Sequence, residues 1–293
     1  MTNRTVTVAR KDFEDAVQSK MLWSLIGLLV FIVGLIYFAV WWNVDSPEAI
    51  DIVGPASAIM QLLVPLVALI AGYLSIVGER QSGSIKVLLS LPPNRRDVVF
   101  GKLLGRSGVI VSAVLAAFLA LVLLSLAVFQ ELPIVDFLGI AGASILTGTA
   151  FVGIAVGVSA MVSSRGKAMA GVIGLYLVFV LFWDLLTAGL YRLLEGELPA
   201  PDPSGQWEAW YVFLQWLNPI EAYAVLTDAV LGESFGAFTI SIFAPQNVSD
   251  TATVVAGDVP AYLQTPVAIP ILLVWFLLPV VLGYLRFRTA DLG

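Results

Sequence analysis

Few residues in this sequence could carry chemistry. The 293 residues include no histidine and no cysteine, which excludes disulfides, thiol catalysis, Cys/His zinc sites and any histidine-based triad. Asp184 is the only charge clearly inside a long apolar run, and an ionisable side chain within a membrane is a functional candidate. We therefore keep Asp184 as a candidate for gating or substrate contact; the alternative is a structural or interfacial acid. A lone aspartate cannot form an aspartyl dyad, so we predict no catalytic and no metal-binding residues.

The sequence also lacks the common phosphate-binding loop. Gly166-Lys167 has neither the glycine five positions earlier nor the following Ser or Thr that this loop needs. The chain therefore cannot cradle ATP by that motif. We expect no cofactor on this chain.

The composition indicates an integral membrane protein. Apolar residues make up 59% of the chain and charged residues only 12%, against roughly 45–50% and about 25% in soluble domains. A membrane-spanning helix needs about 20 mostly apolar residues. Six runs meet this requirement, and we predict six transmembrane helices in an all-α fold. The runs cover about residues 21–42, 58–77, 107–129, 137–162, 168–191 and 267–285.

The basic residues predict the orientation of these helices. With six spans, fourteen of the fifteen Lys and Arg residues fall on the side that holds both termini, and only Arg192 falls on the other. The positive-inside rule then makes both termini cytoplasmic, in a multi-pass protein of the cell membrane. Most acidic residues fall on the outer side. This bias suggests a halophile-like, archaeal composition, and the alternative is simply a set of acidic loops.

Two segments outside the spans are expected to be partly ordered. Residues 1–20 show apolar positions with helical spacing and predict a cytoplasmic interfacial helix, against the alternative of a soluble lead-in helix. Residues 192–266 form the extracytosolic segment, with an interfacial or re-entrant helix. Residues 21–191 then hold helices 1–5, and residues 267–293 hold helix 6 and a cytoplasmic tail. The apolar face of the first segment is formed by Val6, Ala9, Phe13, Ala16 and Val17.

The cytoplasmic loop 79–106, between the second and third spans, is the most informative stretch. It predicts a short amphipathic helix that Pro92-Pro93 ends. The apolar pair Leu88-Leu89 beside Arg95-Arg96 suits docking into a groove of another protein. The alternative is a basic loop that lies against anionic head groups. In the fourth span, Gly153 and Gly157 form a GxxxG pattern that suits helix packing, either within the chain or at a dimer face.

This loop resembles the corresponding loop of ABC-2-type permeases, the membrane subunits of ABC transporters. The resemblance implies that the loop carries a coupling helix between helices 2 and 3, which contacts a nucleotide-binding subunit, and that the N-terminal helix is the family's interface helix. Residues 216–221, Trp-Leu-Asn-Pro-Ile-Glu, are similar to an element of the nitrous-oxide-reductase maturation exporter permeases. The candidate coupling residues are Glu79, Arg80, Gly83, Leu88, Leu89, Pro92, Arg95, Arg96, Gly101 and Lys102.

The resemblance implies the permease of an ATP-driven exporter rather than an enzyme. ATP and Mg would then be bound by a partner ATPase subunit. Six spans are half of the usual set, so we also expect a second permease copy, as a homodimer or with a related permease. The lipid bilayer is a further expected partner, and no nucleic acid is expected. An ion-coupled secondary transporter or channel is the alternative, and Asp184 is its one available ionisable group; a scaffold protein is less favoured.

Overall fold

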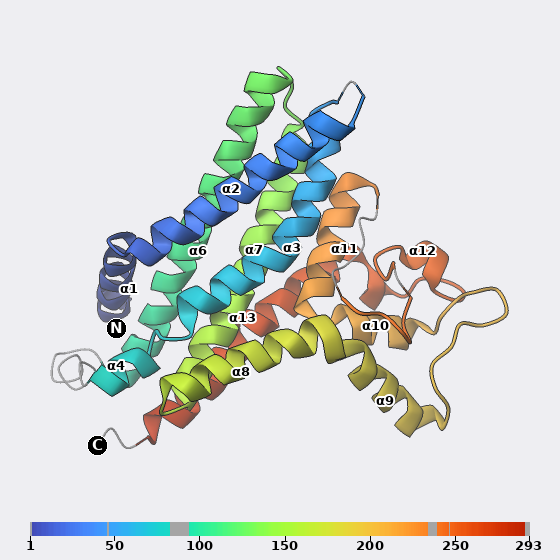
Figure 1. Ribbon diagram of the computed structural model, residues 1–293. Coiled ribbons are helices and arrows are strands. Elements are labelled where there is room, and N and C mark those ends of the chain that lie inside the picture. The colour runs from blue at the N-terminus through green and yellow to red at the C-terminus, as the bar shows by residue number, and fades with distance from the viewer. Residues whose placement is uncertain (1, 46, 83–93, 234–238, 246, 291–293) are drawn as a thin grey trace.

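The computed structural model describes residues 2–45, 47–82, 94–233, 239–245 and 247–290. These residues form helices joined by turns and loops, and within these ranges the only β pairing is an isolated bridge between Trp207 and Val255. Six helical segments are long and apolar enough to cross a membrane. The prediction of an all-α, multi-pass membrane protein with six spans is therefore confirmed (Figure 1).

The six spans differ in how continuous they are. The first, third, fourth and sixth are single helices, whereas the second and fifth are each interrupted. In chain order they are α2 (Lys20–Asn43); α3 (Ile50–Gly72) with α4 (Val77–Ser82); α6 (Arg95–Val128); α7 (Ile134–Met161); α8 (Arg165–Leu177), the π-helix η1 (Val178–Phe182) and α9 (Trp183–Glu195); and α13 (Ala268–Arg288).

Two spans begin earlier than the hydropathy indicated. The second starts at Ile50 rather than near residue 58, and the third starts at Arg95 rather than near residue 107. Asn94 and Asp97 form a capping box that fixes the start of α6: the Asp97 N–H donates to the Asn94 side chain (3.0 Å), and the Asn94 N–H donates to the Asp97 carboxylate (3.1 Å). Residues 95–106 are thus the first turns of a 34-residue helix, because polar residues can extend a helix beyond the apolar core.

The fourth span, α7, lies at the centre of the bundle. It is the most buried of the six spans, and the fifth, made of α8, η1 and α9, is the least buried. Gly153 and Gly157 let α13 approach α7 closely, because a Cβ at either would collide with the backbone of Phe276 or Pro279. In this structure these two glycines therefore pack α7 against α13 of the same chain.

The remaining elements lie at different ends of the bundle. Helix α1 (Thr2–Val17), α4 and the C-terminal end of α13 lie at one end, which we call the basic end (Figure 1). Helices α10 (Ala209–Trp216), α11 (Pro219–Leu231) and the short α12 (Thr251–Val254) lie away from it, followed by the 3-10 turns η2 (Ala261–Leu263) and η3 (Thr265–Val267). Helix α11 packs against α7, α13 and α3.

The fifth span bends at η1, where the turn between α10 and α11 packs against it. The wider turn of a π-helix leaves backbone carbonyls without their usual partners. Asn218 Nδ2 donates to the Phe179 carbonyl (2.8 Å), and the Ile240 N–H donates to the Val180 carbonyl (3.0 Å). The Asn218 Oδ1 also accepts from the Ile220 N–H (3.0 Å) and so begins α11. The buried Asn218 therefore joins the hairpin of α10 and α11 to the fifth span.

Candidate functional site

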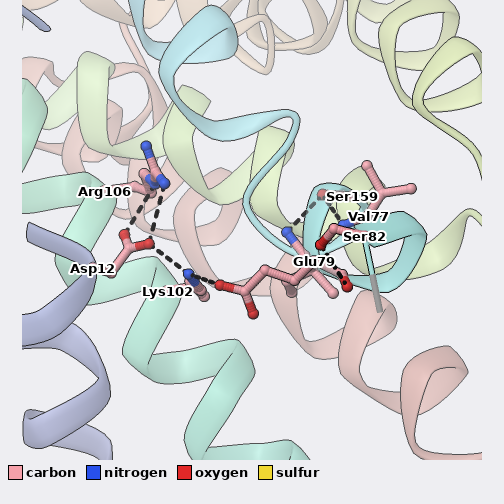
Figure 2. A network of polar contacts seen from close by, with 8 residues as sticks. Asp12, Val77, Glu79, Ser82, Lys102, Arg106 and Ser159 are labelled. Atoms are coloured by element: carbon pink, nitrogen blue, oxygen red, sulfur yellow. Dashed lines mark hydrogen bonds and ion pairs between the residues drawn. The ribbon is translucent and has the colours of Figure 1, made fainter. Parts of the chain in front are cut away.

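Lys102 brings three separate helices together at the basic end. Its ammonium lies 2.7 Å from Asp12 Oδ1, on α1, and 2.5 Å from Glu79 Oε1, on α4 (Figure 2). Lys102 itself is on α6, and its side chain and that of Asp12 are buried, whereas Glu79 is partly exposed. These ion pairs connect the N-terminal helix, the end of the second span and the start of the third.

Arg106 completes the charge balance of this group. It lies one turn after Lys102 on α6, and its Nε is 2.9 Å from Asp12 Oδ2 while its Nη2 donates to Asp12 Oδ1 (3.1 Å). Two carboxylates thus face two cations in a largely buried cluster (Figure 2). A buried charge is tolerated only when it is paired and hydrogen-bonded, so each member depends on the others. We call Asp12, Glu79, Lys102 and Arg106 the ionic junction.

Glycines on α6 allow α1 to come close enough for these contacts. A Cβ at Gly101 would overlap the side chain of Val8, and a Cβ at Gly105 would lie 2.7 Å from Asp12 Oδ2. The buried face of α1 is formed by Val8, Asp12 and Ala16, spaced by four residues. Of the apolar positions predicted from the sequence, Ala16 lies on this buried face, whereas Val6 is exposed. The ion pairs of Asp12 select a face that hydrophobicity alone does not indicate.

Helix α4 is also anchored to the fourth span. The chain turns between α3 and α4, where two backbone N–H groups would otherwise lack partners. Ser159 Oγ, on α7, accepts from the N–H groups of Ile76 (3.1 Å) and Val77 (3.0 Å); Figure 2 shows Ser159 beside Val77. Arg80 Nη1 donates to the Val162 carbonyl at the end of α7 (3.0 Å). The helix that carries Glu79 is thus held by α6 on one side and by α7 on the other.

Arg95 ties the start of α6 to the end of α13. Its Nη1 donates to the carbonyls of Phe287 (2.6 Å) and Ala290 (2.8 Å), and the guanidinium lies 5.5 Å from the centre of the Phe287 ring. The last carbonyls of a helix need such donors. Arg96 lies over Phe100 of its own helix, with 5.8 Å from its Cζ to the ring centre.

The structure brings together part of the candidate set. Glu79 and Lys102 form an ion pair, and Gly101 lies where α1 packs closely against α6. Arg80 and Arg95 donate to carbonyls at the ends of α7 and α13. Gly83, Leu88, Leu89 and Pro92 lie outside the described residues. The sequence reasoning missed Asp12, Arg106 and Ser159. A four-residue spacing of Val8, Asp12 and Ala16 on one helix face was the available signal for Asp12.

Asp184 lies away from the ionic junction, in the first turn of α9. It is buried, and its Oδ2 accepts from the backbone N–H groups of Ile242 (2.6 Å) and Phe243 (2.8 Å). The Tyr211 hydroxyl donates to the Phe243 carbonyl (2.8 Å). These bonds attach residues 239–245 to the fifth span and α10. Within the described ranges, no three His, Cys, Asp or Glu side chains are grouped so that they could hold a metal ion.

The ionic junction is a set of ion pairs between helices. Its carboxylates are held by cations instead of facing an open cavity, so they are poorly placed to exchange protons with a substrate. Because the charges are buried and mutually dependent, separating any pair is costly. The ionic junction thus links α4, α6 and α1 through buried or partly buried ion pairs.

Comparison with known proteins matches nearly the whole chain. The family model described as "ABC-2 family transporter protein" matches residues 6–292. The "Probable ABC transporter permease protein NosY" of Pseudomonas aeruginosa is 29% identical over 227 residues, which cover 75% of this chain and 80% of the relative. The protein of the same name from Stutzerimonas stutzeri is 28% identical over 234 residues, covering 76% of this chain and 81% of the relative.

Proposed function

The chain belongs to the ABC-2 family of transporter proteins, as a membrane permease subunit, and we propose that it forms the pathway of an exporter driven by a separate ATPase subunit. The observation that carries this proposal is the pairing of Glu79 with Lys102. These residues lie on the two helices that bracket segment 83–93, where the family resemblance puts the coupling helix. A force applied to that segment would therefore act on α4 and α6 together.

The contacts around the ionic junction suggest how movement of segment 83–93 would be transmitted to the transmembrane helices. Glu79 and Arg80 extend from α4 to α6 and α7, and Asp12 attaches α1 to α6. Arg95 carries the connection from the start of α6 to the end of α13. When ATP brings two ATPase subunits together, movement of the docked segment 83–93 would shift these helices as a unit and change which side of the membrane the pathway faces.

The proposal includes an orientation and a membrane. In the predicted topology, fourteen of the fifteen Lys and Arg residues fall on the side of both termini, so the positive-inside rule supports a cytoplasmic location for the basic end. Residues 1–20 would then lie at the inner surface of the cell membrane, and residues 192–266 would lie outside, with α10 and α11 as a re-entrant hairpin. ATP and Mg would be bound by the partner chain.

A second copy of the permease is part of the same proposal. Six spans form half of a usual exporter pathway, and the fifth span is the least buried within this chain. Leu185, Leu186 and Leu190 on α9 are exposed. This surface would face the second permease across the pathway or lipid at its edge.

Purification from membranes in mild detergent tests the proposal. A tagged full-length chain should bring down an ATPase subunit in near-equal amount. The Leu88→Asp/Leu89→Asp variant should lose that subunit, because charges replace the apolar pair proposed to enter its groove. Leu193→Asp/Leu194→Asp is the matched control: this exposed leucine pair lies at the C-terminal end of α9, away from the basic end, and its change should leave the subunit bound.

Two results would overturn the proposal. One is a folded wild-type chain that co-purifies with no ATPase. The other is equal retention of the ATPase by both double variants, which would place the docking site elsewhere. The ion-coupled alternative rests on Asp184, and Asp184 Oδ2 accepts from two backbone N–H groups, which fits a structural role for this carboxylate.

A further inference from the structure

A second feature of the basic end is a cavity lined by cations from three spans. Its volume is about 470 Å³, and its walls include Arg80 of α4, Lys167 of α8 and Arg286 of α13. Met161, Val162 and Ser163, at the end of α7 and just after it, form another part of the wall. None of the described residues that line the cavity is acidic.

Two carboxylates of the described residues at the basic end are engaged elsewhere. Glu79 binds Lys102, on the side of α4 that faces α6. Asp97 accepts from Thr5 Oγ1 (2.8 Å) and from the Asn94 N–H in the capping box of α6. Within the described ranges, neither Lys167 nor Arg286 takes part in an ion pair. The charged side chains that the structure describes in the walls of the cavity are therefore all cationic.

The backbone adds to the same positive potential. Helix α8 begins beside the cavity, and Ser164 Oγ caps it by accepting from the Lys167 N–H (3.4 Å). The N-terminal end of a helix carries partial positive charge and attracts anions. Arg80 is oriented by its bond to the Val162 carbonyl. The walls of the cavity thus include two arginines, a lysine and the start of a helix.

The position of the cavity indicates what kind of anion it fits. Met161 ends the fourth span, α8 begins the fifth at Arg165, and Arg286 lies in the last turn of the sixth. The cavity therefore lies at the ends of three membrane spans, where lipid phosphates are found. Basic pockets between transmembrane helices on the cytoplasmic side bind phospholipid head groups, and arginine pairs well with phosphate oxygens.

We propose that this cavity binds a phosphate group, carried by an anionic phospholipid of the inner leaflet or by a soluble phosphate ion. The guanidinium groups of Arg80 and Arg286 and the ammonium of Lys167 would donate to its oxygens, while Met161 and Val162 would contact the glycerol or acyl part of a lipid. This site goes beyond the proposed permease function and does not depend on an ATPase partner.

Phospholipid retention by the full-length chain tests the proposal. The chain is reconstituted in nanodiscs of phosphatidylglycerol and phosphatidylcholine, extracted in mild detergent, and analysed by native mass spectrometry for bound phospholipid. The Lys167→Gln/Arg286→Gln variant should retain phosphatidylglycerol about tenfold less than wild type, because it loses two charge-assisted contacts. Arg165→Gln/Arg288→Gln removes the same charge from neighbouring exposed positions that do not line the cavity, and should stay close to wild type.

The source of the phosphate is separated by competition. Retention of phosphatidylglycerol in the presence of inorganic phosphate at millimolar concentration shows a lipid site. Displacement of the lipid by inorganic phosphate, with the same loss in Lys167→Gln/Arg286→Gln, shows a soluble phosphate site. Equal lipid retention by the two double variants would overturn the proposal, since only diffuse surface charge would then attract the lipid, and so would a wild-type chain that binds neither phosphate source.

Discussion

The Lys102 ammonium and the Glu79 carboxylate lie 2.5 Å apart, although 23 positions separate them in the chain. The segment between them, 83–93, leaves from α4 and returns through α6. The ion pair joins α4 and α6, the two helices on either side of this segment. Asp12 pairs with the same ammonium and so links α1 to them. The segment that would meet an ATPase is therefore connected directly to helices that cross the membrane.

Replacing Lys102 should destabilise the protein strongly. Lys102→Met leaves Asp12 buried with only Arg106 and removes the Lys102 ammonium from Glu79. Removing one partner of a buried pair costs about 3–5 kcal/mol. We expect a clear fall in the thermal unfolding midpoint of the purified chain. Glu79→Gln should cost less, because Glu79 is partly exposed and Lys102 keeps Asp12.

The exposed pair Arg10–Glu14 provides the control for this comparison. Its atoms are 2.7 Å apart, yet both side chains are largely in solvent, and such pairs contribute little to stability. Arg10→Gln should leave the midpoint unchanged. A Lys102→Met variant as stable as Arg10→Gln would show that the ionic junction does not hold these helices together.

A side chain at Gly105 should force α1 away from α6. Its Cβ would lie 2.9 Å from the Ala9 carbonyl oxygen and 2.7 Å from Asp12 Oδ2, and such overpacking costs about 1–3 kcal/mol. Gly105→Val should therefore lower stability and speed tryptic cleavage at Arg10 and Lys11. Gly142→Val, on α7, is the control because no atom lies within 4 Å of its Cβ position. Equal cleavage rates in the two variants would contradict the close approach of α1.

Asn218 should be more important than its loop position indicates. Asn218→Ala removes the cap of α11 and the donor to the Phe179 carbonyl in the π-helix. An unsatisfied buried group costs about 1–3 kcal/mol, so the unfolding midpoint should fall. Asn43→Ala, at the exposed end of α2, should have little effect. Asn218→Asp keeps the capping oxygen but loses the donor; full stability of this variant would rule out the bond to η1 as the important contact.

Stability should depend on pH through Glu221. Burial raises the pKa of Glu221 to about 7, with Asp228 and Asp184 adding to the rise and the hydrogen bond from Thr239 opposing it. A raised pKa means that the folded chain keeps a proton that the unfolded chain has lost. Stability from this group is therefore present below the unfolded value of 4.5 and falls as pH rises towards 7.

Glu221→Gln should remove this dependence. The unfolding midpoint of wild type should fall between pH 5 and pH 8, whereas that of Glu221→Gln should not. The glutamine has no proton to lose, and it can still accept a hydrogen bond from Thr239. Glu233→Gln changes an exposed acid just after α11 and should follow wild type at every pH. Parallel curves for wild type and Glu221→Gln would show that Glu221 does not titrate in this range.

The sequence predicts the spans better than it predicts the contacts between them. Six apolar runs are visible because each span must be apolar by itself, whatever it packs against. The start of α6 at Arg95 is not visible in hydropathy, since its first turns are polar; Asn94 and Asp97 show it instead through capping. The family resemblance names Glu79 and Lys102 as important but does not indicate that they touch.

The rest of the site could not be read from local patterns. Asp12 and Lys102 are 90 positions apart, and the burial of Asp12 depends on two glycines of another helix. On α1 alone, an aspartate among Arg10, Lys11 and Glu14 looks like one more solvent-facing charge. The π-helix in the fifth span is likewise decided elsewhere, by Asn218 and Ile240, which supply the donors for its carbonyls.

Site-specific crosslinking tests the central claim most directly, because the chain has no cysteine of its own. A single cysteine is placed at Ser90, inside segment 83–93, or at the exposed Ser204 beyond the fifth span. The membranes are then treated with a short thiol-to-amine crosslinker. The account predicts that Ser90→Cys forms one adduct with the ATPase subunit and that its yield changes with ATP and Mg, whereas Ser204→Cys forms none. An adduct through Ser204→Cys, or none at Ser90→Cys while the two subunits co-purify, would contradict it.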